Sequence, residues 1–317
     1  MLKYVGQRLL AMLITLVVII TLVFCMIRMM PGGIYDELED ISQAELDALY
    51  AKYNLDKPIG IQYLIFLKKV VTKWDWGYSL KLYPNVPVWN ILGNKIPITI
   101  YENIFALIIS LPLGILFGIW AAIRKNTIVD YAVSVAVVIC ISVPSFVFAS
   151  LLQYFIGFKL GLFPIVYNVD AVGFARFYSM TLPIVALALG PIARVTRYLR
   201  AELAETINSD FMLLARTKGL TEAQATVRHG IRNSLLPILT TLVSMFTHIM
   251  SGSLVIESIF GIPGMGGLMI KAINSIDYNV TQATLMFYSI ISLGTTLLCD
   301  LLYGVVDPRI RVGGKKE

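Results

Sequence analysis

Few residues in this chain have the types and spacing that catalysis or metal binding requires. The three cysteines, Cys25, Cys140 and Cys299, stand far apart inside apolar runs, so we interpret them as packing residues. The apolar runs hold no H-E-x-x-H motif, no paired acids and no Ser with a base. The nucleotide-binding motif G-x-x-x-x-G-K-[ST] is also absent, because Gly314-Lys315 is followed by Lys316. We therefore expect that the chain is not an enzyme and binds neither a cofactor nor a metal ion. Any energy from nucleotide hydrolysis must come from a partner protein.

The most informative polar stretch is the segment 200–234. Asn208, Ser209 and Asp210 are poor helix-interior residues and good N-caps, so a short helix should begin near Phe211. That helix should stop at Gly219, because glycine favours the left-handed conformation that ends many helices.

A second helix should begin immediately afterwards. Thr221 followed by Gln224 makes a capping box, and the helix then carries His229 and Arg232 toward Pro237. The pattern predicts a rigid helical elbow, and stiff, packed contacts of this kind can pass motion from a soluble motor to membrane helices. The alternative is an amphipathic loop that lies on anionic lipid with its basic residues down.

The composition shows which elements must carry this elbow. The 317 residues are 57% hydrophobic and 15% charged, with a mean hydropathy of +0.75, so the chain needs lipid around it. A helix crosses the bilayer core with about 20 apolar residues. Six stretches satisfy this length, and they cover residues 9–27, 103–123, 131–158, 177–193, 234–256 and 278–299.

The distribution of Lys and Arg predicts the orientation. The net charge of +6 and the pI near 9.1 could suggest nucleic acid, but basic residues beside apolar runs more often set membrane topology. Seven Lys and Arg lie between Arg194 and Arg232, whereas the two short loops on the other side hold only Lys159, Arg176 and Lys271. Both termini should therefore face the cytoplasm, and we expect no nucleic-acid partner.

The segment between the first two spans should be ordered and extracytoplasmic. Ser42 and Glu45 make a capping box, and Pro58 can open a helix that runs toward Lys73. We expect an anchor helix over 1–30, an insert over 31–96, a membrane domain over 97–306 that contains the loop 200–234, and a tail over 307–317.

Two segments of the elbow resemble the cytoplasmic signature of ABC importer permeases in the dipeptide, oligopeptide and nickel branch. They are Ala215-Arg216-Thr217-Lys218-Gly219-Leu220 and Arg228-His229-Gly230-Ile231-Arg232-Asn233-Ser234-Leu235-Leu236-Pro237. Segments along nearly the whole chain agree, including Pro31-Gly32-Gly33, Leu55-Asp56-Lys57-Pro58, Ile141-Ser142-Val143-Pro144-Ser145-Phe146, Leu160-Gly161-Leu162-Phe163-Pro164, Ile259-Phe260-Gly261-Ile262-Pro263-Gly264-Met265-Gly266 and Asp307-Pro308-Arg309-Ile310-Arg311. Leu213-Leu214 departs from the Glu-Ala of the general importer motif, but the long gap from Gly219 to Pro237 is typical of the peptide branch.

The resemblance implies an all-α type I ABC importer fold in a bacterial inner membrane. Together the segments resemble the B-type subunit of an oligopeptide permease, so the resemblance implies a pore subunit of an ATP-driven oligopeptide importer. Its implied partners are a homologous C-type subunit, one or two ATPase subunits that hold ATP and Mg, and an extracytoplasmic peptide-binding protein. The short helix would dock in a cleft of an ATPase subunit. The coupling residues would be Phe211, Ala215, Arg216, Lys218, Gly219, Leu220, Thr221, His229, Arg232 and Asn233.

A peptide path must accept many side chains, so it should rely on width, water and polar groups rather than on a tight pocket. Prolines within spans bend helices, and Glu257, near the end of the span 234–256, should face protein or water. The candidate path or gate residues are Ser142, Pro144, Ser145, Gln153, Glu257, Phe260, Pro263 and Asn274. A dipeptide or nickel importer, an ion-coupled carrier and, last, an intramembrane enzyme are the competing interpretations.

Overall fold

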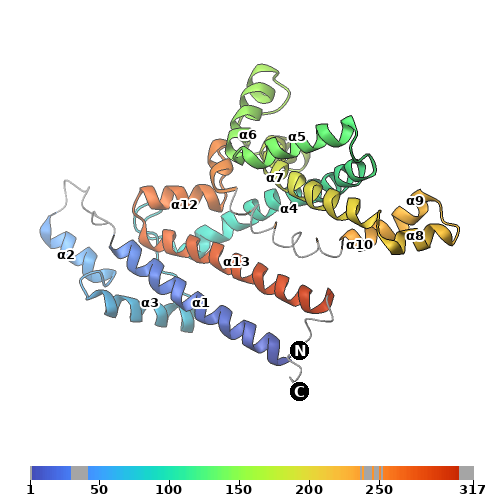
Figure 1. The fold of residues 1–317 in the computed structure, drawn as a ribbon. Coiled ribbons are helices and arrows are strands. Elements are labelled where there is room, and N and C mark those ends of the chain that lie inside the picture. Colours follow the sequence, from blue (N-terminus) through green and yellow to red (C-terminus); the bar gives the residue numbers. More distant parts are fainter. Residues whose placement is uncertain are drawn as a thin grey trace. The chain divides into compact units, whose positions relative to one another are not determined.

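The computed structural model describes residues 2–29, 42–235, 238, 245, 250 and 253–306, and these are predominantly helical (Figure 1). The only β pairing among them is an isolated bridge between Tyr78 and Pro87, so the predicted all-α class is confirmed. The helices are α1 (Leu2–Arg28), α2 (Gln43–Lys52), α3 (Ile59–Lys73), α4 (Val88–Ile123), α5 (Ile128–Ser142), α6 (Ser145–Leu152), the π-helix η1 (Gln153–Lys159), α7 (Phe174–Thr206), α8 (Asp210–Thr217), α9 (Glu222–Ala225), the π-helix η2 (Thr226–Gly230), α10 (Ile231–Leu235), α12 (Met265–Asn274) and α13 (Tyr278–Val306).

Four helices of the described residues are long and apolar enough to cross a membrane. They are Val5–Arg28, Val88–Ile123, Phe174–Thr206 and Tyr278–Leu301. Four of the predicted spans fall within them, although α4 begins 15 residues before the predicted start at Asn103. Most of the predicted span 234–256 lies outside the described residues.

The predicted span 131–158 is not one continuous helix. It is a pair of helices, Ile128–Ser142 and Ser145–Lys159, bent by 103°. Pro144 has no N–H to donate and disfavours helical backbone at the residue before it, and Val143 is extended at φ −89° and ψ 126°. Pro144 then stands as the N-cap of α6, so the expected proline bend is a complete break.

The local signals of the predicted insert are confirmed. Ser42 and Glu45 form a full capping box at the start of α2, and Pro58 is the N-cap of α3. Helix α3 ends at Trp74, which adopts the left-handed conformation at φ 53°. The helix runs to Lys73, as the sequence predicts.

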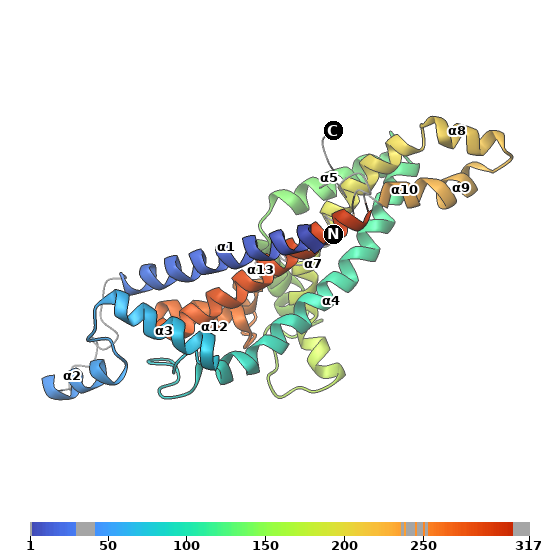
Figure 2. The same cartoon turned by 90° about the horizontal axis from the view of Figure 1, so that it is seen from below.

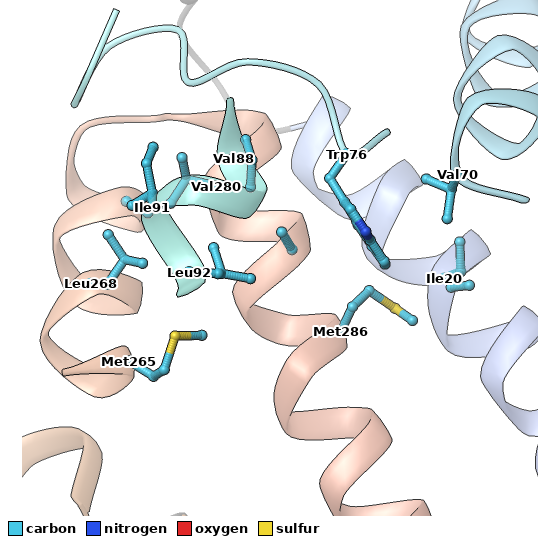
Figure 3. Close-up of a cluster of buried hydrophobic side chains, with 12 residues drawn as sticks. Ile20, Val70, Trp76, Val88, Ile91, Leu92, Met265, Leu268, Val280 and Met286 are labelled. Carbon is cyan, nitrogen blue, oxygen red and sulfur yellow. The ribbon is translucent and has the colours of Figure 1, made fainter. Parts of the chain in front are cut away.

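The chain divides into two compact units, and the predicted insert belongs to the one that comprises residues 6–98 and 263–293. Its apolar core joins residues from α1, α3, the loop after α3, the start of α4, α12 and α13 (Figure 3). Trp76, Met265 and Met286 are almost fully buried there. Burying side chains of this size stabilises the unit by about 2 kcal/mol each, so helices distant in sequence are held together.

In the second unit, which includes residues 99–262, α4 crosses α7 at two glycines. A Cβ on Gly114 would lie 2.6 Å from the Cβ of Val195, and one on Gly118 would lie 2.9 Å from the Cβ of Leu199. Thr196 Oγ1 donates a hydrogen bond to the Gly114 carbonyl at 3.2 Å. Small residues four apart allow backbones to approach this closely, as in other membrane helix pairs.

Candidate functional site: a helical elbow and the helices it contacts

The elbow predicted from the sequence is present. Helix α8 runs from Asp210 to Thr217, and α9, η2 and α10 follow it after a turn and lead back toward α7 (Figure 2). Thr221 and Gln224 form both hydrogen bonds of the predicted capping box, at 3.2 and 3.0 Å. Ser209 is the N-cap of α8, but its hydroxyl donates to the Thr206 carbonyl at 2.6 Å.

The turn after α8 is a Schellman motif centred on Gly219. The Gly219 N–H donates to the Arg216 carbonyl at 3.0 Å, and the Leu220 N–H donates to the Ala215 carbonyl at 3.3 Å. Gly219 has φ +93°, a conformation in which any side chain is strained, although a Cβ there would meet no atom within 4 Å. Leu220 packs against the core beneath α8, which completes the motif.

The two faces of α8 differ in burial. Met212 and Ala215 are buried against Ala225, so Ala215 holds the two arms of the elbow together. The outward face is apolar and exposed: Phe211 is 44%, Leu213 57% and Leu214 54% accessible. Exposed apolar residues grouped on one short helix are typical of a protein contact surface.

The other predicted coupling residues differ in their surroundings. Arg216 is half-buried and donates to the carbonyls of Met212 and Ile207, both at 3.3 Å, so it braces α8 against the end of α7. The remaining side chains are exposed, and they are Lys218, Thr221, His229, Arg232 and Asn233.

The elbow is tied to the long helix α7. Ser234 of α10 donates to the Thr206 hydroxyl at 3.0 Å, and a Cβ on Gly230 would lie 3.3 Å from Leu203. Leu199 and Leu203 are fully buried in a cluster that also contains Ile231 and Leu235 as partly buried members. A displacement of the elbow would therefore pass directly into α7.

A salt bridge connects α7 to α5. Arg200 donates from Nε and Nη2 to the two carboxylate oxygens of Asp130, at 2.9 and 2.7 Å. Asp130 is 2% exposed and also accepts the Asn126 N–H at 2.9 Å. The bidentate geometry fixes orientation as well as distance, so it ties α5, which leads to the break at Pro144, to α7.

The predicted path residues belong to several elements. Ser142, Pro144 and Ser145 lie at the break between α5 and α6, where Ser142 and Pro144 are exposed. Gln153 instead connects the loop after η1 to the end of the helical stretch 253–259, because its Nε2 donates to the carbonyls of Ile165 and Ile259, at 2.8 and 3.1 Å.

Pro263 and Asn274 belong to the unit that contains α12. Pro263 is half-buried just before α12, and Asn274 is the exposed last residue of that helix.

Glu257 lies in a buried polar cluster with residues of α4. Its Oε1 accepts the Thr99 hydroxyl at 2.6 Å, and both residues are inaccessible to solvent. Glu102 is also fully buried near Glu257, and its two carboxyl oxygens have no hydrogen-bond partner within the described part of the chain. Acidic groups buried in apolar helices are costly, so this cluster is a candidate functional element.

The chain segment that follows Glu257 is fixed by the same region. Gly261 ends the helical stretch 253–259 with φ +67°, and the Ile262 N–H donates to the Glu257 carbonyl at 2.8 Å. Phe260 is fully buried, and its carbonyl accepts the Tyr167 N–H at 2.8 Å. The candidate gate residues Glu257 and Phe260 are therefore held in the interior.

Several functional candidates escaped the sequence analysis. Thr99 and Asp130 each bond a partner far away in the chain, and Glu102 lies buried near Glu257, but nothing in their immediate neighbours indicates these contacts. The paired glycines Gly114 and Gly118 did carry a signal, since the G-x-x-x-G spacing within an apolar stretch predicts a close helix contact.

The comparisons with known proteins agree with this architecture. Residues 114–312 match the family of binding-protein-dependent transport system inner membrane components. A dipeptide transport system permease protein of Lactococcus lactis subsp. cremoris is 38% identical over 98% of this chain and 100% of its own length. An oligopeptide transport system permease protein of Escherichia coli K12 is 33% identical over 98% of this chain and 100% of its own length.

A solved structure shows a similar fold over about two thirds of this chain. A crystal structure of an amino acid ABC transporter covers 68% of this chain and 94% of its own, with 19% identity and a TM-score of 0.52. This chain belongs to the family of binding-protein-dependent transport system inner membrane components. It is thus a non-catalytic, multi-pass subunit of a bacterial inner membrane transporter.

Proposed function

We propose that this chain is one of two homologous permease subunits that form the path of an ATP-driven peptide importer. The observation that carries the proposal is the rigid elbow, whose α8 presents Phe211, Leu213 and Leu214 outward while its other face is buried. An exposed apolar helix face of this kind suits insertion into a groove on a soluble partner.

The mechanical role follows from the contacts of the elbow. The ATPase subunit would move α8, the packing of α10 would carry that motion into α7, and the Arg200–Asp130 bridge would pass it to α5. Each contact is short and packed, so the motion would not be dissipated in a flexible loop. ATP and Mg would be bound by one or two ATPase subunits.

The remaining partners follow from the family. We propose a homologous C-type permease subunit in the membrane and an extracytoplasmic binding protein that delivers the peptide. Six spans with both termini in the cytoplasm would place the elbow on the side of the ATPase, and the insert over 31–96 on the side of the binding protein. The membrane domain would cover residues 97–306, with the tail over 307–317.

The substrate is proposed to be a short peptide. Two dipeptide permease proteins are 38% and 37% identical to this chain, and oligopeptide permease proteins are 32% and 33% identical. The higher identities favour dipeptides over the longer oligopeptides that the sequence motifs suggested.

The buried cluster of Thr99, Glu102 and Glu257 is proposed to act as part of the gate. It is closed to solvent in this conformation, and Gln153 and Tyr167 hold the Ile259–Phe260 turn beside it. Opening the path would expose the acidic side chains to water and so remove the free-energy cost of burying them.

The test is an affinity purification of the tagged chain in mild detergent, followed by mass spectrometry and an ATPase assay on the eluate. The proposal expects a homologous permease, one or two ATPases and a peptide-binding protein. Uptake of labelled dipeptide should then be competed by unlabelled dipeptide. A chain that purifies alone and moves solute down an ion gradient would replace the proposal with an ion-coupled carrier.

A further inference from the structure

An apolar groove lies among α4, α5 and α7, in the unit that includes residues 99–262. It has a volume of about 530 Å³ and is lined by residues within 109–117, 132–140 and 185–196. The volume falls within the range of small-molecule sites, which is about 300–1,000 Å³.

The wall of this groove offers almost nothing to a polar ligand. Among the described residues that line it, only Cys140 and Thr196 carry a polar side-chain atom. The Thr196 hydroxyl already donates to the Gly114 carbonyl at 3.2 Å, and a thiol is a weak hydrogen-bonding group. A peptide seated here would bury N–H and C=O groups without partners, which is costly. The groove therefore suits a hydrocarbon chain.

A second cavity, of about 330 Å³, continues the groove toward the elbow end of α7. The residues that line both spaces are Val133, Val137 and Thr196. The second cavity adds the polar side chains of Ser134, Arg197 and Arg200, and none of the described residues that line it is acidic. The groove thus leads from an apolar interior to a basic mouth.

Arg197 is the available cation at this mouth. It is exposed and has no ion pair or hydrogen bond with the described residues, whereas Arg200 is held by Asp130. Arg124 and Lys125, both exposed, add positive charge from the loop that leads to α5, whose backbone also binds Asp130. A guanidinium with free N–H groups beside other cations is a usual receptor for a phosphate group.

The length of the groove matches one leaflet of a bilayer. Arg197 and Val185, at its two ends, are 12 residues apart on α7, which corresponds to about 18 Å. Half of the bilayer core measures about 15 Å. Because α7 is long and apolar enough to cross the membrane, its basic mouth would lie at headgroup level on the side of the elbow.

We propose that this groove binds an anionic phospholipid from the leaflet on the side of the elbow. Its phosphate would lie on Arg197, and one acyl chain would lie between α4, α5 and α7. Basic pockets between membrane helices are known to bind lipid headgroups in this way. The lipid would fill the space between α5 and α7 beside the Arg200–Asp130 bridge, and its binding does not depend on which substrate is transported.

The test is native mass spectrometry of the full chain with its co-purified partner subunits, titrated with lipids in detergent. Phosphatidylglycerol should bind about fivefold more tightly than phosphatidylcholine with the same acyl chains, the effect expected of one basic residue beside an anionic lipid. Arg197→Gln should remove this preference. Arg228→Gln is the matched control, because Arg228 is an exposed arginine of the elbow that lines neither cavity.

A second pair of variants tests the acyl chain. Ala136→Phe places a ring in the groove from an exposed position of α5 and should weaken phosphatidylglycerol binding several-fold. Val135→Phe is its control, because Val135 is the exposed neighbour and lines neither cavity.

Four results would each overturn the proposal. They are equal affinity for the two lipids, equal effects of the two arginine variants, unchanged lipid binding in Ala136→Phe, and loss of the partner permease from the Ala136→Phe complex but not from the Val135→Phe complex. The last result would mark the groove as a contact between subunits. None of them would alter the assignment of the chain as a permease, which does not rest on this groove.

Discussion

Asp277 offers the most demanding test of how the loop after α3 is built. Its carboxylate is fully buried, and Oδ2 accepts the Ser79 hydroxyl at 2.6 Å and the N–H groups of Leu80, Lys81 and Leu82 at 3.0, 3.0 and 3.1 Å. One carboxylate oxygen thus holds the loop after α3, which lies almost 200 residues earlier in the sequence. This loop also lines a cavity of about 380 Å³ in the same unit.

The expected loss can be worked from these bonds. Hydrogen bonds to a charged group contribute about 1.5–3 kcal/mol each and neutral ones about half as much, but four donors that share one oxygen are not additive. We therefore expect Asp277→Asn to lower the stability of this loop by about 2–4 kcal/mol. Asp277→Ala, which leaves buried donors without an acceptor, should lower it by about 3–5 kcal/mol.

Hydrogen exchange is the assay, because it reads the affected amides directly. Since about 1.4 kcal/mol corresponds to a factor of ten, the amides of Leu80, Lys81 and Leu82 should exchange at least about tenfold faster in Asp277→Asn, and faster still in Asp277→Ala. The exposed Asp56→Asn is the matched control in the same unit and should change nothing. Unaltered exchange at these three amides in Asp277→Ala would refute the reasoning.

Three further predictions follow from single positions. Gly219→Ala should lower the free energy of unfolding by about 1–2 kcal/mol through backbone strain alone. Gly219→Pro should abolish peptide uptake at normal membrane expression, since proline cannot adopt φ +93°. Normal uptake by Gly219→Pro would contradict the role of the turn. Gly114→Ala should lower the free energy of unfolding by about 1–3 kcal/mol through overpacking, and Val195→Gly, which removes the Cβ that the new methyl group meets, should recover part of that loss; an additive loss in the double variant would be the opposite result. The Ser42 hydroxyl and backbone N–H hold the pKa of Glu45 below its ordinary value. The capping box therefore stabilises α2 fully at pH values above the ordinary pKa of Glu45, and this stabilisation is lost as the pH falls through the lowered pKa. Amide exchange in α2 should show this pH dependence, and Ser42→Ala should remove it.

The sequence predicts the local elements well because their signals lie in adjacent residues. The capping boxes at Ser42 and Thr221 and the turn at Gly219 depend on neighbours within a few positions, and all of these elements are present, whereas at Pro144 the expected bend is a complete break. Helix α4 begins 15 residues before the predicted span, because Lys95 and Glu102 interrupt the uncharged run without interrupting the helix. Hydropathy indicates which residues face lipid, and it says little about where a helix begins.

The candidate sites were predicted less completely, because their contacts join distant segments. Glu257 was a candidate from its place at the end of an apolar run, but Thr99, its hydrogen-bond partner, stands 158 residues earlier, and Glu102 also lies near it. Asp130 and Arg200 are separated by 70 residues. Side-chain type shows that a buried charge needs a partner, whereas only the packing of the helices shows which one it has.

The central claim, that the outward face of α8 couples the permease to ATP hydrolysis, is tested most directly by Leu214→Asp in the reconstituted importer. Ala223→Asp is the control, since it places the same charge on an exposed position of α9 at the helix start, where an acid is tolerated. We predict that Leu214→Asp loses the ATPase subunit on purification and loses peptide uptake, while Ala223→Asp retains both. Retention of the ATPase and of normal uptake by Leu214→Asp would contradict the account.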